Sequence, residues 1–411
     1  MATGHILINR TEKHRKTNMN ISEHSKTKEC NNHSDSIEVS VVMPCLNEEG
    51  GIASCINKAK AAIKSNKLNA EIIIVDNGST DNSVEIARNL GARVIIQNEK
   101  GYGCAYQLGI SQARGKYIVI GDSDDTYDFS EIMKFIFPLR DGWEFVNGSR
   151  MKGKIHADAM PHLHRYVGNP LLSFILNLFF KSSFSDVYCG MKAFTKETYE
   201  KMKPVSPGME FALELIIKAS RLNLKRTEVV VDLHPRKGES KLRTFRDGWR
   251  SLRFMLLYCP NYLFLLPGGL IFISGSLGMF FLLKGPVKLF NHTFNFDAMI
   301  FSSMLALLGF QLINLGIFAK SYAFAEGFER KDNLFSVFYK LFNLEKGILL
   351  GGSFVAVGIF MTISIIKHWI FFASVSQQRN ELFAFTLIVI GIQVIFSSFL
   401  ISLIGIKKKV A

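Results

Sequence analysis

The sequence has few cysteines and none of the spacings that would indicate a zinc site or a disulfide framework. Six cysteines occur in 411 residues, and no two of them form a Cys-x-x-Cys pair. The absence of paired cysteine spacings agrees with a reducing compartment. Residues 1–36 also lack the apolar core of a signal peptide, and their polar composition predicts a flexible N-terminal segment.

Acidic residues are outnumbered, with 35 Asp and Glu against 49 Lys and Arg, which gives a formal net charge of +14. A basic chain could bind nucleic acid, but the sequence has no separate basic motif that would contact bases. The basic residues cluster instead beside the apolar segments of the last third. We therefore expect a membrane and phosphate groups as partners, and no nucleic acid.

Long apolar segments are missing from the earlier part of the chain and then come in succession. Four windows of the last third are long and nearly uncharged, at about 261–283, 298–319, 347–371 and 382–405. At about 1.5 Å per residue, each reaches roughly 30 Å, the thickness of the hydrocarbon core of a bilayer. Residues 261–411 are therefore predicted to form an all-α membrane domain with four transmembrane helices.

The distribution of Lys and Arg predicts the orientation of these helices. Five basic residues lie in the connector after the second window and three lysines near the C-terminal end, whereas the connector after the first window holds Lys284 and Lys288 alone. Since cytoplasmic loops carry the excess of positive charge, both termini and the large N-terminal part are expected in the cytoplasm. The chain is then a multi-pass membrane protein, of the cell inner membrane in a prokaryote or of the endoplasmic reticulum in a eukaryote.

The part of the chain before these windows alternates strand-like and helix-like segments. Such alternation is typical of α/β proteins that have a largely parallel sheet with helices on both faces. The predicted strands are 37–43, 71–75, 93–96 and 117–120, and the predicted helices lie near 52–65, 83–90 and 102–113.

Two later segments suit a membrane surface. Residues 171–180 form an apolar run, too short to span a bilayer, that lies on the membrane or packs as an ordinary core helix. Residues 244–257 are predicted to form an amphipathic helix, with apolar residues such as Trp249 on one face and arginines such as Arg250 on another. The alternative for 244–260 is a plain basic flank before the first span.

Polar side chains follow three of the predicted strands where these strands end, in 44–49, 76–81 and 121–125. Because parallel strands end at one edge of the sheet, where α/β proteins bind nucleotides, we expect these side chains to meet there. Asp122 and Asp124 are candidate ligands for Mg2+ or Mn2+, since a nucleotide diphosphate needs a divalent cation and hard cations take carboxylate oxygens. The alternative for an Asp-rich turn alone is a solvated loop.

Two other motifs fit less well. A calcium loop that starts at Asp122 would need a glycine and a glutamate where Tyr127 and Met133 stand. A dinucleotide fingerprint that starts at Gly101 would have Tyr106 in place of its third glycine.

The strand-end stretches resemble those of membrane-associated family 2 glycosyltransferases, in particular the polyprenyl-phosphate (dolichol-phosphate-type) sugar synthases. The resemblance covers roughly residues 37–257, and the tail resembles the subset with added transmembrane helices. It implies that residues 37–243 form a GT-A-type domain that binds a nucleotide sugar. Asp76 would read the base, although it can also cap its own turn. The nucleotide-binding residues implied by the resemblance are Pro44, Asn47, Glu48, Asp76, Gly78, Ser79 and Asp122.

The resemblance extends to a loop that would contact the lipid phosphate. The stretch 234–242 resembles this loop, in which Arg236, Ser240 and Lys241 reach phosphate oxygens. Arginine offers a planar fork to phosphate and lysine a point charge. The alternative is a basic loop that touches lipid headgroups without selectivity.

Three further residues are implied by the resemblance alone. Arg150 and Arg165 resemble positions that face the acceptor, and Asp186 resembles a candidate active-site carboxylate. The predicted catalytic residues are then Asp122, Asp124, Asp186, Arg236 and Lys241.

These features predict an inverting transfer of a sugar from a UDP- or GDP-sugar to a polyprenyl phosphate, such as undecaprenyl or dolichyl phosphate, at the cytoplasmic membrane face. A phosphate monoester has a second pKa of about 6, so its oxygen attacks as an anion and Asp186 would position groups rather than take a proton. One alternative is a processive polysaccharide synthase, although the Gln-x-x-Arg-Trp segment of those enzymes does not occur. Another is a non-catalytic membrane protein that binds or flips a lipid-linked sugar. The sequence leaves homo-oligomer formation open.

Overall fold

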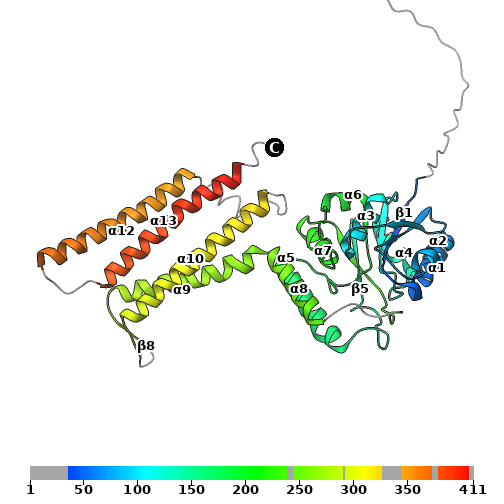
Figure 1. The fold of residues 1–411 in the computed structure, drawn as a ribbon. Coiled ribbons are helices and arrows are strands. Elements are labelled where there is room, and N and C mark those ends of the chain that lie inside the picture. The colour runs from blue at the N-terminus through cyan, green and yellow to red at the C-terminus, as the bar shows by residue number, and fades with distance from the viewer. Residues whose placement is uncertain (1–35, 238–243, 290–291, 326–343, 373–377, 407–411) are drawn as a thin grey trace, which may run out of the picture. The chain divides into compact units, whose positions relative to one another are not determined.

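The computed structural model describes residues 36–237, 244–289, 292–325, 344–372 and 378–406 (Figure 1). Apart from its last residue, the predicted flexible segment 1–36 lies outside the described residues. So do Ser240 and Lys241 of the predicted phosphate loop.

A seven-stranded sheet with the order β3-β2-β1-β4-β6-β5-β7 organises the first part of the chain. The pairs β1–β2, β2–β3, β1–β4 and β5–β7 are parallel, and β6 is antiparallel to β4 and to β5. The predicted α/β class with a mostly parallel sheet is thus confirmed. The strands are β1 (Val39–Cys45), β2 (Ala70–Asp76), β3 (Arg93–Ile96), β4 (Tyr117–Ile120), β5 (Phe145–Ser149), β6 (Lys192–Thr195) and β7 (Arg226–Val230).

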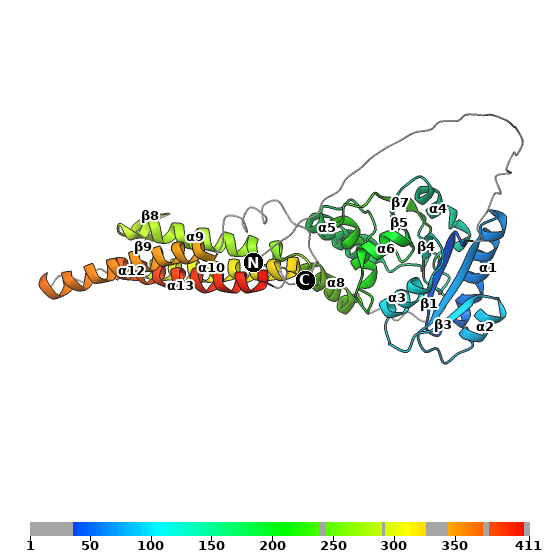
Figure 2. The same ribbon diagram turned by 90° about the horizontal axis from the view of Figure 1, so that it is seen from above.

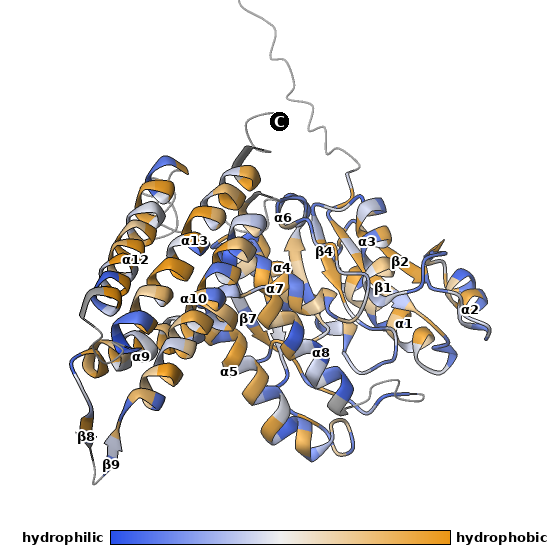
Figure 3. Cartoon of the chain, turned by 60° about the vertical axis from the view of Figure 1, so that its left-hand side comes forward, coloured by the Kyte–Doolittle hydropathy of each residue, from blue (hydrophilic) through white to orange (hydrophobic). Residues whose placement is uncertain are grey.

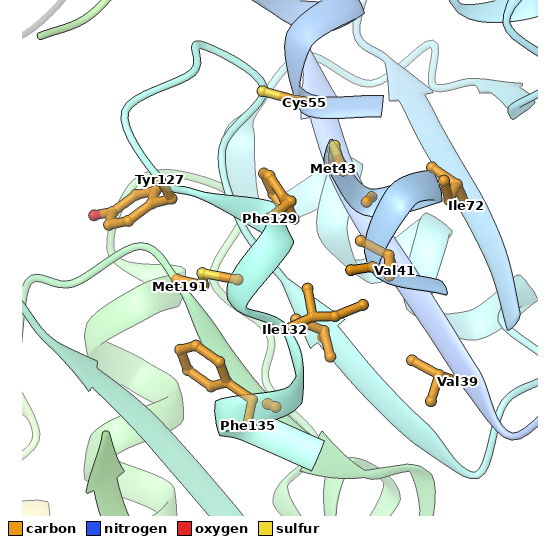
Figure 4. Close-up of a cluster of buried hydrophobic side chains, with 14 of the residues drawn as sticks. Val39, Val41, Met43, Cys55, Ile72, Tyr127, Phe129, Ile132, Phe135 and Met191 are labelled. Carbon is orange, nitrogen blue, oxygen red and sulfur yellow. The ribbon is translucent and has the colours of Figure 1, made fainter. Parts of the chain in front are cut away.

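The sheet separates two hydrophobic cores, because successive side chains of a strand point to opposite faces. Val41 and Met43 of β1 belong to one core and Val42 to the other. Figure 4 shows part of the first core, where Phe129 and Phe135 join the strand residues. Both faces of the sheet are therefore covered, as a parallel sheet requires.

Helices cover both faces of the sheet (Figures 1 and 2). Residues of α1, η1 and α4 contribute to the first core, and residues of α3, α5, α7 and α8 contribute to the second. The helices of this part are α1 (Glu49–Ser65), α2 (Ser83–Asn89), α3 (Tyr102–Gln112), η1 (Phe129–Glu131), α4 (Met133–Arg140), η2 (His164–Gly168), α5 (Asn169–Phe180), α6 (Lys196–Met202), α7 (Phe211–Arg221) and α8 (Thr244–Leu257).

The two segments predicted to suit a membrane surface are the helices α5 and α8, and each has a buried and an exposed side. In α5, Leu176 is buried in the second core, whereas Phe174 and Leu178 are exposed. In α8, Met255 is buried in the same core and Trp249 is 62% exposed. Each helix therefore belongs to the domain core and still presents apolar side chains outward.

Within the described residues, four helical segments are long and apolar enough to cross a membrane: Asn261–Leu283, Phe296–Phe324, Leu344–Ile370 and Gln378–Ile404. Figure 3 shows how predominantly hydrophobic they are. The first consists of η3 (Asn261–Leu265) and α9 (Leu266–Leu283), and the others belong to α10 (Phe296–Ala325), α12 (Leu344–Phe372) and α13 (Gln378–Ile406). The short strands β8 (Val287–Leu289) and β9 (His292–Phe294) pair between α9 and α10.

One of these helices runs further than the sequence predicts. The predicted window ends at residue 319 because a charged residue follows, yet α10 continues through Lys320. Lys320 is only 5% exposed, and its amino group donates to Asn261 Oδ1 at 3.2 Å. A polar partner on the neighbouring segment therefore lets the helix accommodate the charge.

Candidate active site

The polar stretches that follow β1, β2 and β4 meet at one edge of the sheet, as predicted from parallel strand ends. The Ser123 hydroxyl donates to the carbonyl of Pro44 at 2.6 Å. The Asn47 amide accepts from the Thr80 backbone N–H at 2.7 Å, and the Ser79 hydroxyl accepts from the Asn47 N–H at 2.9 Å. Residues from all three strand ends thus contact one another directly.

The turn after β2 is held by its own aspartate. The Asp76 carboxylate is buried and accepts backbone N–H bonds from Gly78 and Ser79, each at 3.0 Å. Gly78 has a φ of +92°, a conformation that favours glycine. Capping of this turn, one of the two roles considered for Asp76, is what the geometry shows. The predicted contact with a base stays a prediction.

The aspartates of the acidic turn after β4 have different surroundings. Asp122 accepts from the Tyr102 hydroxyl at 2.8 Å. Burial and, next, the negative charge of Asp124 raise the pKa of Asp122 to about 6, although Tyr102 and Arg236 act in the opposite direction. Asp122 also has a close backbone neighbour, because a Cβ on Gly190 would lie 2.5 Å from Asp122 Oδ2.

Asp124 is buried and each of its oxygens has a partner. Oδ1 accepts from the backbone N–H of Thr126 at 3.1 Å and from its hydroxyl at 2.6 Å, while Oδ2 lies 3.3 Å from Arg236 Nη1. The N-terminal end of α1 approaches this turn so closely that a Cβ on Gly51 would lie 2.9 Å from the Ser123 carbonyl oxygen. A side chain at Gly51 would therefore displace the turn.

The third aspartate, Asp125, is engaged elsewhere. It forms ion pairs with Lys58 at 2.8 Å and with Lys237 at 2.6 Å. Burial alone would raise the pKa of Asp125, but the hydrogen bonds from Lys237 and Lys58 lower it. The charge of Asp125 is thus compensated by two lysines.

Asp122 and Asp124 suit a hard divalent cation. The described residues include no cluster of three or more His, Cys, Asp or Glu side chains that could enclose an ion. Mg2+, however, is usually held by one or two carboxylates and completes its coordination with water and substrate phosphates. Burial and, next, the neighbouring charge of Asp124 raise the pKa of Asp122, and a bound cation would favour its ionised form. The donor set therefore fits the predicted Mg2+ or Mn2+.

The segment after β7 crosses the acidic turn. The N–H of His234 donates to the Thr126 carbonyl at 3.0 Å, and the N–H of Lys237 donates to the Asp124 carbonyl at 3.1 Å. Between them, Arg236 forms an ion pair with Glu48 as well as with Asp124. Arg236 thus lies at the acidic pair, as the predicted site requires, whereas Ser240 and Lys241 are outside the described residues.

Arg150 and Asp186 form a buried ion pair with two side-chain hydrogen bonds, from Nε to Oδ2 at 2.6 Å and from Nη2 to Oδ1 at 2.9 Å. Asp186 is 0% exposed. Burial would raise the pKa of Asp186, but the charge of Arg150 and its hydrogen bonds lower it. The pair therefore suits positioning better than proton transfer.

Arg165, another residue implied by the resemblance, lies in η2, 5.3 Å from the ring centre of Tyr166.

A buried lysine that sequence analysis did not single out lies behind this pair. Lys192 is fully buried at the start of β6 and donates to Asn147 Oδ1 at 2.9 Å and to the Cys189 carbonyl. Burial lowers the pKa of Lys192 to about 8. Its position in the apolar run from Met191 to Phe194 is a weak signal, because a lysine there could equally face solvent.

The rejected dinucleotide motif has a packing role. A Cβ on Gly103 would lie 2.0 Å from the Ser206 carbonyl oxygen, and one on Gly101 would lie 2.3 Å from the Pro207 carbonyl oxygen. The two glycines therefore let α3 begin against the 206–208 loop. This start places Tyr102, another residue that the sequence did not indicate, at Asp122.

Family models match two parts of the chain. Residues 40–203 match the model described as glycosyl transferase family 2, and residues 317–405 match the glycosyltransferase family 2 C-terminal transmembrane region. The first match covers the strand ends described above, and the second covers parts of α10, α12 and α13.

Two relatives come from Haloferax volcanii. The low-salt glycan biosynthesis hexosyltransferase Agl6 is 38% identical over 371 residues, which cover 89% of each chain. A dolichyl-phosphate hexose transferase is 32% identical over 212 residues, which cover 51% of this chain and 89% of the relative. Among solved structures, glucosyl-3-phosphoglycerate synthase from Mycobacterium tuberculosis is similar with a TM-score of 0.43 and 22% identity, over 54% of this chain and 78% of that one.

Proposed function

The chain belongs to glycosyltransferase family 2 and is a glycosyltransferase with a GT-A-like α/β domain, and from this premise we propose that it makes a polyprenyl-phosphate sugar. In this reaction a sugar moves, with inversion, from a nucleotide diphosphate sugar to a polyprenyl phosphate at the cytoplasmic membrane face. The observation that carries the proposal is the meeting of Arg236 with Asp124 at 3.3 Å. This contact places Arg236, which would bind the acceptor phosphate, beside the carboxylates that would bind the cation of the donor's diphosphate.

The transfer needs no general base. An oxygen of the lipid phosphate attacks the anomeric carbon, the bond from that carbon to the diphosphate oxygen breaks, and the nucleoside diphosphate leaves with the electron pair. A phosphate monoester has a second pKa of about 6, so the attacking oxygen is already anionic near neutral pH. This agrees with the ion pair that binds Asp186 to Arg150.

Different residues of the strand ends would bind the nucleoside, the cation and the acceptor phosphate. The turns of Asn47 and Asp76 would hold the nucleoside. Asp122 and Asp124 would hold Mg2+ or Mn2+, and such an ion, when bound, neutralises the charge that develops on the leaving diphosphate. Arg236 would then orient the acceptor phosphate, together with the predicted Ser240 and Lys241.

The exposed sides of α5 and α8 support a lipid acceptor. Phe174 and Leu178 of α5 and Trp249 of α8 are exposed apolar side chains, and Arg250 and Arg253 accompany Trp249 on α8. Apolar and aromatic residues beside arginines suit the headgroup layer. We propose that these sides meet the membrane, where the phosphate of the acceptor lies, and the name of the dolichyl-phosphate hexose transferase relative supports the same acceptor class.

Membranes that contain the full chain test this proposal when they are incubated with radiolabelled UDP- and GDP-sugars, with and without added polyprenyl phosphate. We expect a lipid-extractable labelled product that requires Mg2+ or Mn2+. Asp124→Asn should lower its formation by at least about a hundredfold. Asp141→Asn, at an exposed aspartate after α4, is the matched control and should keep full activity. Label in a long polymer, or none in lipid with any donor, would contradict the proposal.

A further inference from the structure

Arg236 is paired with carboxylates from two separate strand ends. Its Nη1 lies 3.3 Å from Asp124 Oδ2, and its Nη2 contacts Glu48 Oε1. Its Nε is buried and has no hydrogen-bond partner among the described residues. Each of the two terminal nitrogens thus faces a carboxylate, one on Asp124 and one on Glu48.

Arg236 and a divalent cation would compete for Asp124. Its Oδ1 is already occupied by both Thr126 donors, so Oδ2, which faces Arg236, is the oxygen with capacity for a new ligand. A cation at that oxygen would also be a positive charge beside a guanidinium, and like charges at such distances repel. Cation binding at this oxygen would therefore weaken the contact between Arg236 and Asp124.

Glu48 keeps Arg236 near the site when that contact breaks. Glu48 is buried at the N-terminal end of α1, where its N–H donates to Ser83 Oγ at 2.9 Å. The backbone of Lys237 is separately bonded to the Asp124 carbonyl. These fixed points allow the guanidinium to turn while it stays near Asp124.

We propose that Glu48 is a positioning residue for Arg236, and that Asp124 exchanges Arg236 for the donor's cation, which frees the guanidinium for the acceptor phosphate. The inference rests on the proposed function and departs from the predicted role of Glu48 in nucleotide binding. Its consequence is a coupling: the donor and its cation increase the affinity for the acceptor, and the acceptor increases the affinity for the donor by the same factor.

The exchange is tested first with the metal alone. Binding of Mn2+ to the purified full chain is followed by the electron paramagnetic resonance signal of free Mn2+. Because Arg236 competes for Asp124, Arg236→Gln should bind Mn2+ several-fold more tightly than the wild type. Arg140→Gln, which removes a surface pair with Glu38, is the matched control and should not change Mn2+ affinity. Unchanged or weaker Mn2+ binding in Arg236→Gln would overturn the exchange.

The positioning role is tested with a short-chain prenyl phosphate, whose binding is measured with and without UDP plus Mn2+. We expect UDP plus Mn2+ to increase its affinity by about tenfold in the wild type, within the usual range of coupling between sites. Glu48→Gln should reduce this gain to about twofold, and it should have no further effect in an Arg236→Gln background. Glu49→Gln, at the exposed neighbour that bonds Asn82, is the control.

Other outcomes separate this inference from the proposed function. If Glu48 serves only the ribose, Glu48→Gln will weaken UDP binding and leave the gain in prenyl phosphate affinity intact, which refutes the positioning role. If the acceptor is not a prenyl phosphate, no variant will bind the probe, and the proposed function fails while the Mn2+ result still decides the exchange.

Discussion

At the scale of single residues, the pair of Arg150 and Asp186 shows how a buried charge can serve a site without reacting. Asp186 is 0% exposed, and two side-chain hydrogen bonds join it to Arg150. It also accepts from the Tyr188 N–H at 3.2 Å, at the start of the loop that brings Gly190 against Asp122. The pair therefore fixes the loop on which the acidic turn rests.

Asp186→Asn should leave measurable activity but lower stability. The amide has nearly the same shape, yet Arg150 would remain buried without its counter-charge, and breaking such a pair typically costs about 3–5 kcal/mol. We expect a clear fall in the apparent Tm of the purified chain and a reduced, non-zero transfer rate per folded molecule. Complete loss of transfer in a folded Asp186→Asn protein, equal to that of Asp124→Ala, would contradict the base-free reaction.

Lys192 should make stability depend on alkaline pH. Burial lowers its pKa from 10.5 to about 8 in the folded chain, so between these values the unfolded chain binds more protons. Stability then rises with pH across this window, and the cost of the buried charge is fully present below about pH 8.

A comparison of wild type with Lys192→Met measures this effect. The difference in apparent Tm between the two should shift in favour of the wild type as the pH rises from 8 to 10. Lys60→Met, at an exposed position of α1, provides the control and should show no such trend. A difference that is flat across the window would mean that Lys192 is neutral, or equally charged, in both states.

The acidic turn could be predicted from sequence, but its partners could not. Parallel strand ends bring Asp122, Asp124 and Asn47 together whatever the loops do, so a pattern of three strands sufficed. The contact of Arg236 with Glu48 joins residues 188 positions apart, and it depends on the path of the segment after β7. Arg150 and Asp186 were expected individually, but nothing local to either indicates that they pair.

At the scale of elements, the apolar run of α5 packs into the core on one side of the helix and is exposed on the other. The sequence left open whether residues 171–180 lie on a membrane or in a core, and the helix does bury Leu176 and Phe180 while it exposes Leu171, Phe174 and Leu178. The alternation could not be resolved from composition, since both sides of the helix are predominantly apolar. The first four strands of the sheet were predicted close to their observed positions, whereas β5, β6 and β7 were not predicted.

Phe174→Ser tests the proposed contact of α5 with lipid. The exposed ring makes no contribution to the core, so folding should be preserved, but loss of its contact with the membrane should weaken acceptor capture. We expect kcat/KM for polyprenyl phosphate in liposomes to fall several-fold while the affinity for UDP plus Mn2+ is unchanged. Phe137→Ser, at another exposed phenylalanine, on α4, is the control. Equal effects of the two substitutions would argue against a membrane role for α5.

At the scale of the whole molecule, the proposed orientation of the chain in the membrane depends on the four candidate spans and on the distribution of charge. The four helices are apolar enough to cross a bilayer. Polar side chains within them are paired where they meet, as Ser303 and Thr386 do at 2.7 Å between α10 and α13. Such a pair removes the cost of an isolated hydroxyl in hydrocarbon. Such pairs favour packing of the helices against one another. With an even number of spans, the chain returns to the side of the membrane on which it started.

The proposed orientation predicts which loops an impermeant reagent can reach. With the α/β domain in the cytoplasm, the β8–β9 segment between α9 and α10 must lie on the opposite side, where Lys288 is exposed. Lys288→Cys should therefore react with a membrane-impermeant maleimide added to intact cells, or to sealed vesicles of the same sidedness. Lys60→Cys, on α1, should react only after the membrane is opened. Cysteines of the described residues are all buried, which keeps the background low. Labelling of Lys60→Cys but not of Lys288→Cys in intact cells would place the nucleotide-sugar site on the other face, where the charge distribution of the connectors does not predict it.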